Sequence, residues 1–274
     1  MNTQNTMEKG NGDIWFDIFA GQFKQRTGQC ASVKVADGML DGQSARVIAV
    51  VPDPKNHYPR AVKGEVGLLE GWTLGQMVNE AIQEDRDKPV KRAIVAIIDV
   101  PSQAYGRREE AFGIHLALAA AAGAYANARL AGHPVIGLIV GKAMSGAFLA
   151  HGYQANRLIA LNDKDVMIHA MGKASAARIT LRTVEALEKL ASTIPPMAYD
   201  ISNYKTLGLL EDLIDVTDPK RPTDEEVAIV KAAVVKAIDT ARREGVGLSN
   251  RLGSPNRAST SLVRERMRAE WNAA

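Results

Sequence analysis

Cysteine is almost missing from this chain, which has one, Cys30, among 274 residues. A single thiol cannot close an internal disulfide and argues against a metal site built from cysteines, so we expect neither a disulfide nor a bound metal. A marked excess of one charge is missing as well, because 34 lysines and arginines face 31 acids and leave a net charge of +3. Because positive and negative charges nearly cancel, the composition argues against nucleic acid as a partner.

Long apolar runs are also missing. No stretch reaches the roughly 18 apolar residues that a membrane-spanning helix needs, and the polar N-terminus does not follow the basic-then-apolar order of a secretory signal. We therefore expect a soluble cytoplasmic protein that does not enter a membrane. At 46% hydrophobic content, the chain can bury one large core.

What the sequence does contain is an alternation of short apolar strands and longer helical segments. Apolar runs predict strands at 32–35, 45–51, 94–100, 135–140, 157–161 and 165–169. Helical spacing predicts helices at 15–23, 74–84, 109–130, 176–190, 196–203 and 224–243. The dipeptide Asp41-Gly42 suits a hairpin between the first two strands, and the helix at 109–130 is long enough to connect parallel strands. We expect three regions, a flexible leader, an α/β domain and an arginine-rich arm, at 1–13, 14–244 and 245–274.

Residues 134–153, PVIGLIVGKAMSGAFLAHGY, place a turn of small residues between a buried strand and an apolar helix. The first N–H groups of a helix have no acceptor within it, and together with the positive end of the helix dipole they suit a developing oxyanion. Small residues would let a carbonyl group approach these amides. The same spacing also fits close packing of a helix against a sheet, and the pattern alone leaves both interpretations open.

Ser145 stands at the apex of this turn, as the nucleophile does in a strand-to-helix elbow. With His169 at the end of a later strand and Asp215 or Asp218 further along, it could form a nucleophile, base and orienting acid. The alternative is that Ser145 is simply small enough for the turn and that His169 is a hydrogen-bonded polar residue at the sheet edge. A phosphate-binding loop is excluded, since Ala147 stands where such a loop requires lysine.

Residues 139–172, IVGKAMSGAFLAHGYQANRLIALNDKDVMIHAMG, resemble the ClpP/crotonase superfamily, and the likeness extends over roughly residues 30–218. Four segments are similar to the carboxyltransferase and decarboxylase branch, and within it to the gamma subunits of biotin-independent malonate decarboxylase: Asp99–Pro101, Pro134–Ile136, Gly141–Gly146 and Leu207–Asp212. The resemblance implies an α/β fold of the crotonase type, a ββα superhelix with a parallel core sheet and surrounding helices.

That resemblance also implies a chemistry, the loss of CO2 from a malonyl thioester to leave an acetyl thioester. It implies that the thioester is carried on the phosphopantetheine-type arm, derived from dephospho-CoA, of an acyl carrier protein. A homologous beta subunit is the implied partner, and no cofactor is bound directly to this chain. Loss of CO2 puts negative charge on the thioester oxygen, which each well-placed N–H donor stabilises by about 3 kcal/mol. By position in the motif, Gly146 is the predicted donor, with Ser145 or Ala147 beside it.

Further site residues follow from their positions. The loop with Gly64 and Gly67 falls where superfamily members carry a second oxyanion contact. Lys142 and Met144 in the turn, and Tyr105 before the long helix, are candidates for contact with the substrate. Four side chains can donate a proton or bind an anion, or serve a purely structural role: Tyr105, Tyr153, His169 and Lys173.

Two other functions stay open. A Clp-like serine hydrolase would use Ser145 as nucleophile and His169 as base, whereas a chain without catalysis would serve as a scaffold for its partner. Arginines of the C-terminal arm suit an acidic carrier protein or the phosphates of its arm, but also an ordinary solvated surface. They are Arg251, Arg257, Arg264, Arg266 and Arg268.

Overall fold

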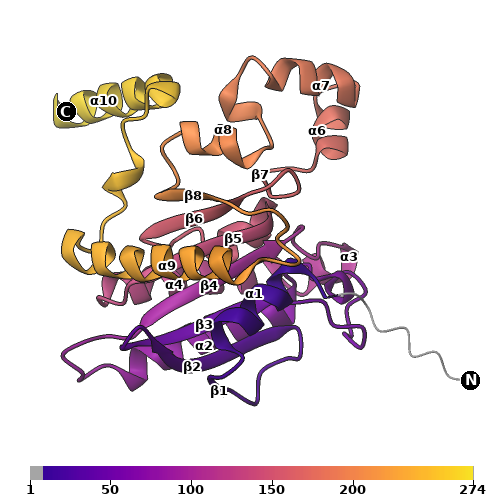
Figure 1. Cartoon of the computed structure of the whole chain (residues 1–274). Coiled ribbons are helices and arrows are strands. Elements are labelled where there is room, and N and C mark those ends of the chain that lie inside the picture. Colours follow the sequence, from indigo (N-terminus) through magenta and orange to yellow (C-terminus); the bar gives the residue numbers. More distant parts are fainter. Residues whose placement is uncertain (1–8, 274) are drawn as a thin grey trace, which may run out of the picture.

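The computed structural model describes residues 9–273, and its centre is one eight-stranded sheet (Figure 1). The strands are β1 (Lys24–Gln25), β2 (Val33–Leu40), β3 (Gln43–Val50), β4 (Ala93–Val100), β5 (Val135–Met144), β6 (Arg157–Asn162), β7 (Met167–His169) and β8 (Asp212–Asp215). Across the sheet they follow the order β1-β2-β3-β4-β5-β6-β8. The short strand β7 pairs with the last residues of β5, beyond the part of β5 that pairs with β6.

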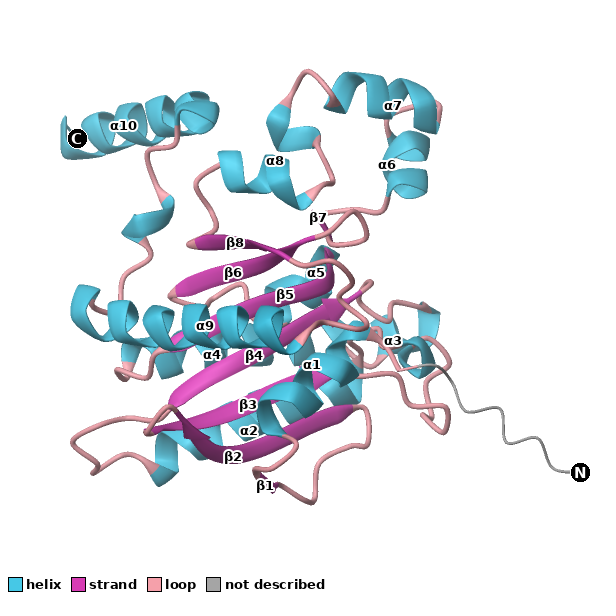
Figure 2. Ribbon diagram, in the orientation of Figure 1, coloured by secondary structure: helices cyan, strands magenta, loops and turns pink. Residues whose placement is uncertain are grey.

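Helices cover both faces of this sheet. They are α1 (Asn11–Ala20), α2 (Leu68–Glu84), α3 (Arg107–Ala111), α4 (Ile114–Leu130), α5 (Ser145–Ala150), α6 (Lys173–Ile179), α7 (Val184–Ala191), α8 (Ile201–Thr206), α9 (Asp224–Glu244) and α10 (Ala258–Ala273). Short 3-10 turns occur at Ala61–Lys63, Pro195–Met197, Ser249–Arg251 and Pro255–Arg257. In Figure 2, α1 and α9 cross the near face of the sheet, and α2 and α4 lie together behind it. None of the helices within residues 9–273 combines the length and the apolar character needed to cross a membrane.

The strands from β3 to β8 pair in parallel, and β1, β2 and β3 pair antiparallel. Strand β4 reads AIVAIIDV and is buried on both faces, as expected for a parallel strand with helices on each side. The hairpin turn predicted at Asp41-Gly42 is confirmed, since both residues adopt the left-handed conformation that such turns require. The α/β class with a parallel core sheet is therefore confirmed.

Several predicted boundaries were wrong for reasons of local backbone geometry. The helix predicted at 109–130 is two helices, because Gly113 adopts φ +79° between α3 and α4. The helix predicted at 176–190 also breaks, at Leu181 with φ +53°. Strand β8 was missed, since its sequence, Asp-Leu-Ile-Asp, is too short to show alternation.

The leader ends earlier than residue 13, because α1 begins at Asn11. The Asn11 side-chain amide donates to Val140 O at 2.7 Å, and Gly12 N–H donates to the Asp99 carboxylate at 3.2 Å. These bonds fix the start of α1 against the ends of β4 and β5. The part of the predicted leader at 1–8 lies outside the described residues.

The C-terminal arm is an anchored segment followed by an exposed helix. Arg251 is buried and donates to the backbone oxygens of Tyr153 and Ala155, so it holds the arm to the domain and cannot offer its charge to a partner. The prediction that Arg251 lies on the surface, free for a carrier protein or for solvent, was therefore wrong. Helix α10 has no buried residue, and Figure 1 shows it projecting away from the sheet.

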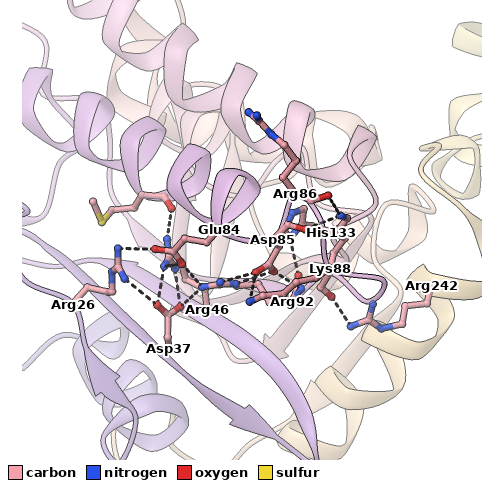
Figure 3. A network of polar contacts seen from close by, with 12 residues as sticks. Arg26, Asp37, Arg46, Glu84, Asp85, Arg86, Lys88, Arg92, His133 and Arg242 are labelled. Carbon is pink, nitrogen blue, oxygen red and sulfur yellow. Dashed lines mark hydrogen bonds and ion pairs between the residues drawn. The ribbon is translucent and has the colours of Figure 1, made fainter.

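A network of buried charges lies at the amino ends of β3 and β4 (Figure 3). Arg46 in β3 is fully buried and binds the Asp37 carboxylate through two nitrogens, at 2.8 and 2.7 Å. Arg92, just before β4, holds the Asp85 carboxylate in the same two-nitrogen manner and also approaches Glu84 at 2.8 Å. The turn after β5 lies at the carboxyl ends of the parallel strands, so this network lies at the opposite ends of the strands from that turn.

Candidate active site

The strand-to-helix turn is sharper than the sequence indicates. Strand β5 continues through Met144, and α5 begins at once with Ser145, which has φ +56°. A non-glycine residue in this left-handed region carries backbone strain of roughly 1–2 kcal/mol, and such strain is concentrated at functional sites. Helix α5 has only six residues, so its first amides, more than the dipole of the whole helix, would act on a ligand.

Gly141 is the glycine that this turn needs for packing. A Cβ atom at this position would lie 2.2 Å from Asp99 Oδ1. Asp99 ends β4, accepts Lys142 N–H at 3.0 Å and also binds Gly12. The carboxylate therefore joins β4, β5 and α1 through space that only a glycine leaves open. At Gly146, in contrast, the nearest atom to a built Cβ is 3.4 Å away, an ordinary contact.

Gly141→Ala is therefore expected to lower the free energy of unfolding by about 3 kcal/mol, the upper end for forced overpacking. Urea unfolding at neutral pH measures this cost. In an Asp99→Ala background the same substitution should cost much less, because the atoms it meets first are gone. Gly146→Ala is the matched control and should change stability little. Equal costs at the two glycines would contradict the assigned role of Asp99.

A cavity of about 390 Å³ opens beside the turn. It is lined by Ser145 and Gly146 at the start of α5, by His169 at the end of β7, and by Tyr153. Its other walls are mostly apolar and come from α5, β7 and the segment 196–209, including Phe148, Leu149, Ile168 and Leu207. The structure thus brings together three of the four predicted catalytic residues, while Ala147 is fully buried beneath them.

The imidazole of His169 is fixed from two sides. Its Nδ1 lies 2.9 Å from Met171 O and 3.1 Å from Met171 N, and its ring stacks on Tyr199 with 3.9 Å between centroids. Burial lowers the pKa of His169 below its usual value, which favours the neutral ring. The nitrogen left to face a ligand is Nε2.

No carboxylate orients this histidine among the described residues. Its Nδ1 is engaged with the backbone of Met171, whereas Asp215 accepts from the Asn162 side chain at 2.6 Å and Asp218 accepts Lys220 N–H at 2.9 Å. No hydrogen bond joins Ser145 to His169 within residues 9–273 either. The hypothesis of a serine nucleophile, histidine base and aspartate therefore finds no assembled triad.

The second predicted oxyanion contact is not available at the two glycines named for it. Gly64 N–H donates to Ala61 O at 3.0 Å, where it caps a 3-10 turn. Gly67 N–H donates to the buried Glu70 carboxylate at 3.0 Å, where it caps α2. Both amides serve helix caps, and neither glycine lines the cavity.

Other predicted contacts also lie away from the cavity. Lys142 is exposed, and Met144 is buried in a small cluster with Ala176 and Leu187. The Arg60 guanidinium lies over the ring of Tyr105 at 4.3 Å, on the loop that precedes α3. Lys173 forms an ion pair with Glu188 at 2.7 Å and is not among the cavity residues.

One residue at the turn was missed by sequence reasoning. Gln103 Oε1 accepts Gly146 N–H at 3.0 Å. Gln103 follows Pro101, which ends the strand region of β4, and the parallel pairing of β4 with β5 brings it beside the turn. The sequence did contain a signal for this residue, because Gln103 is a carboxamide just after the end of a strand that was expected to lie beside the turn.

Comparison with known proteins identifies relatives over most of the chain. The family described as "Malonate decarboxylase gamma subunit" matches residues 61–271. The malonyl-S-ACP:biotin-protein carboxyltransferase MADD of Malonomonas rubra is 36% identical over 191 residues, which make up 68% of this chain and 65% of that protein. The chain thus spans slightly less than two thirds of this relative's length.

Comparison with solved structures agrees with this family match. A malonate decarboxylase hetero-tetramer from Pseudomonas, in complex with coenzyme A, contains a chain that is 57% identical, with a TM-score of 0.92 over 95% of this chain and 99% of that one. The transcarboxylase 12S core is only 19% identical, with a TM-score of 0.62 over 82% of this chain and 41% of the other. The second likeness shows the fold alone, and it confirms the carboxyltransferase-like, crotonase-type architecture.

Proposed function

Since the chain belongs to the malonate decarboxylase gamma-subunit family, we propose that it takes part in decarboxylating a malonyl thioester carried on an acyl carrier protein. The cavity beside the left-handed turn at Ser145 is the observation that carries the proposal. Gly146, the His169 ring and mostly apolar walls line this one space. The family match covers all of these residues.

The chemistry needs a place for the electron pair of the broken bond. As the carbon–carbon bond to the carboxylate breaks and CO2 leaves, that pair moves onto the α-carbon and the thioester oxygen. An N–H donor aimed at this oxygen bonds the enolate more strongly than the neutral thioester, so it lowers the barrier. In the proposal Gly146 N–H is this donor, and the strain at Ser145 sets its direction.

Apolar walls and His169 complete the proposed step. Phe148, Leu149 and Ile168 keep water away from the reacting thioester, which strengthens the hydrogen bond to the enolate. The enolate then takes a proton at carbon to give the acetyl thioester. His169 is the cavity side chain proposed to deliver that proton: in the neutral ring Nδ1 accepts Met171 N–H, so Nε2 carries the proton, gives it to the α-carbon and takes another from solvent.

A homologous beta subunit and an acyl carrier protein are the proposed partners. A similar chain occurs in a hetero-tetramer with bound coenzyme A, which supports a partner chain and a pantetheine-type arm. The arm, derived from dephospho-CoA, would bring the thioester to the cavity, and no cofactor would bind this chain permanently. The cytoplasm is the proposed location of the complex.

Helix α10 is the surface we assign to a partner subunit. Val263, Met267 and Trp271 recur at every fourth position and therefore share one face of the helix, and all are exposed, Trp271 by 85%. Exposed arginines flank this face, at Arg264, Arg266 and Arg268. An unburied helix with an aromatic anchor and a basic rim has the composition of a protein interface.

The double variant Met267→Ser, Trp271→Ser is expected to weaken assembly with the beta subunit at least tenfold, the effect of losing a contact worth about 2 kcal/mol. Analytical ultracentrifugation of the two subunits measures it. The thermal midpoint of the isolated chain should not change, because both side chains are exposed. Val90→Ser is the control, an exposed valine in the loop between α2 and β4. Unchanged assembly would exclude this face of α10 as the contact.

The function itself is tested by CO2 release from a malonyl-thioester carrier protein by the chain with its beta subunit. Ser145→Ala should keep turnover within about threefold of wild type, because no step uses the hydroxyl, whereas loss of a covalent nucleophile costs on the order of 10⁶-fold. Ser145→Gly is the matched control, since glycine accepts the left-handed conformation without strain. A wild-type complex that releases no CO2 and is acylated at Ser145 would instead establish a hydrolase.

A further inference from the structure

The carboxamide of Gln103 covers the amide that the proposed chemistry requires. Its Oε1 accepts Gly146 N–H at 3.0 Å, and the same oxygen is the nearest atom to a Cβ built on Gly146, at 3.4 Å. Leu118 Cδ1 follows at 3.5 Å on the same side. An acceptor atom of a ligand would have to take the position that the Gln103 oxygen holds.

The backbone under this side chain is fixed. Val66 and Gln103 form a parallel bridge, in which Val66 N–H donates to Ser102 O at 3.0 Å and Ala104 N–H donates to Val66 O at 2.8 Å. Val66 and Ala104 are fully buried. The carboxamide can therefore leave Gly146 only by rotation of its own side chain, and it returns to the same place when a ligand departs.

The hydrogen bond between Gln103 and Gly146 is also weak enough for a ligand to replace it. Within residues 9–273, the bond to Gly146 is the only hydrogen bond that the Gln103 side chain makes. Both groups are neutral, and such a bond contributes far less net free energy than one in which a partner is charged. Gln103 is half-buried, so its carboxamide can turn toward solvent when it is released.

We propose that Gln103 is a displaceable occupant of the oxyanion position, whose side-chain oxygen holds Gly146 N–H until a thioester oxygen replaces it. The inference rests on the proposed function. A neutral thioester oxygen gains little by the exchange, because it gives up one neutral bond to make another. An enolate oxygen gains more, since its bond is charge-assisted. Displacing Gln103 costs every ligand the same bond, so a neutral thioester is held weakly, whereas an enolate oxygen still gains from its charge-assisted bond.

The test compares Gln103→Leu, which removes the acceptor and leaves an apolar side chain, with Gln103→Glu, which makes the acceptor charged. The probe is S-acetyl-pantetheine, a neutral thioester, titrated against the assembled beta–gamma complex. Gln103→Leu should bind it about twofold to tenfold more tightly, as expected for removal of one competing neutral hydrogen bond. Gln103→Glu should bind it more weakly, and KM for the malonyl thioester should shift in the same directions. Gln22→Ala, an exposed carboxamide elsewhere, is the control.

Hydrogen exchange gives a second readout that needs no activity. Without ligand, peptides that span Gly146 should exchange one amide faster in Gln103→Leu than in wild type, and the probe should restore the protection. A Gln103→Leu complex that binds the probe no better, or that loses kcat with KM unchanged, overturns the proposal, the second result by placing Gln103 in contact with the transition state. If wild type releases no CO2, the proposed function fails separately, and unaltered exchange at Gly146 would still overturn the contact with Gln103.

Discussion

Arg92→Ala should lower the free energy of unfolding by about 3 kcal/mol, the lower end of the cost of breaking a buried ion pair, because Lys88 still binds Asp85 in the variant. The Asp85 side chain is almost wholly buried, and Arg92 donates to it through Nε at 2.9 Å, Nη2 at 2.6 Å and the backbone N–H at 2.8 Å (Figure 3). The substitution removes the two side-chain bonds together with the contacts to Asp37 and Glu84. Urea unfolding at pH 7 measures the loss.

Arg86→Ala is the matched control for this prediction. Arg86 lies next to the network in the chain, but its side chain is exposed, so its removal should change stability by less than about 0.5 kcal/mol. A second comparison replaces the pair, Asp85→Leu with Arg92→Met. Because apolar residues of similar size need no charge partner, the double variant should be more stable than Arg92→Ala alone. A cost for Arg92→Ala no larger than for Arg86→Ala would show that the buried pair contributes little.

The pH dependence of the same pair has a definite sign. The side-chain bonds from Arg92 and Lys88 hold the pKa of Asp85 well below its usual value of 3.8. A carboxyl with a lowered pKa stabilises the fold above the unfolded pKa, and this contribution is lost as the pH falls below about 4. The difference in stability between wild type and Arg92→Ala should therefore be constant near neutral pH and shrink in acid.

Features encoded by neighbouring residues could be predicted from the sequence. The buried parallel strands were visible as aliphatic runs, the hairpin as Asp41-Gly42, and the crossover as a long helix between two such strands. Each depends on contacts or dihedral angles within a few residues. The same holds for Ser145 at the apex of the turn, whose left-handed conformation is the strained elbow that the motif indicates.

Features that depend on which distant segments meet in space could not be predicted from the sequence. The loop with Gly64 and Gly67 was predicted to supply an N–H group for an oxyanion. In the structure Gly64 N–H donates to Ala61 O and Gly67 N–H donates to the Glu70 carboxylate, and both bonds cap helical turns. For the small residues of the turn the sequence left substrate access and close packing both open, and at Gly141 the structure shows close packing, against the Asp99 side chain. Asp99 comes from another strand, so no local pattern distinguishes the packing glycine from the one beside the cavity.

The contrast between these glycines gives the sharpest prediction for activity. Gly146→Val is expected to lower kcat for CO2 release about 10²–10³-fold, the cost of losing one oxyanion donor. The Cβ of an alanine fits at 3.4 Å from Gln103 Oε1, but one γ-methyl of valine extends further into the space in front of the Gly146 amide. That space is where the thioester oxygen must lie, so valine keeps the N–H and blocks its use.

Gly146→Ala is the control that separates this effect from loss of structure. It adds a Cβ in ordinary contact and should fold and assemble as wild type does, with a smaller loss of kcat than valine. Assembly with the beta subunit is measured for both variants by size-exclusion chromatography before CO2 release is compared. If Gly146→Val assembles and turns over at the wild-type rate, the amide does not contact the reacting oxygen, and this chain would act as a scaffold for catalysis in its partner. A graded loss from glycine through alanine to valine, with assembly intact, would place the oxyanion at the turn that follows β5.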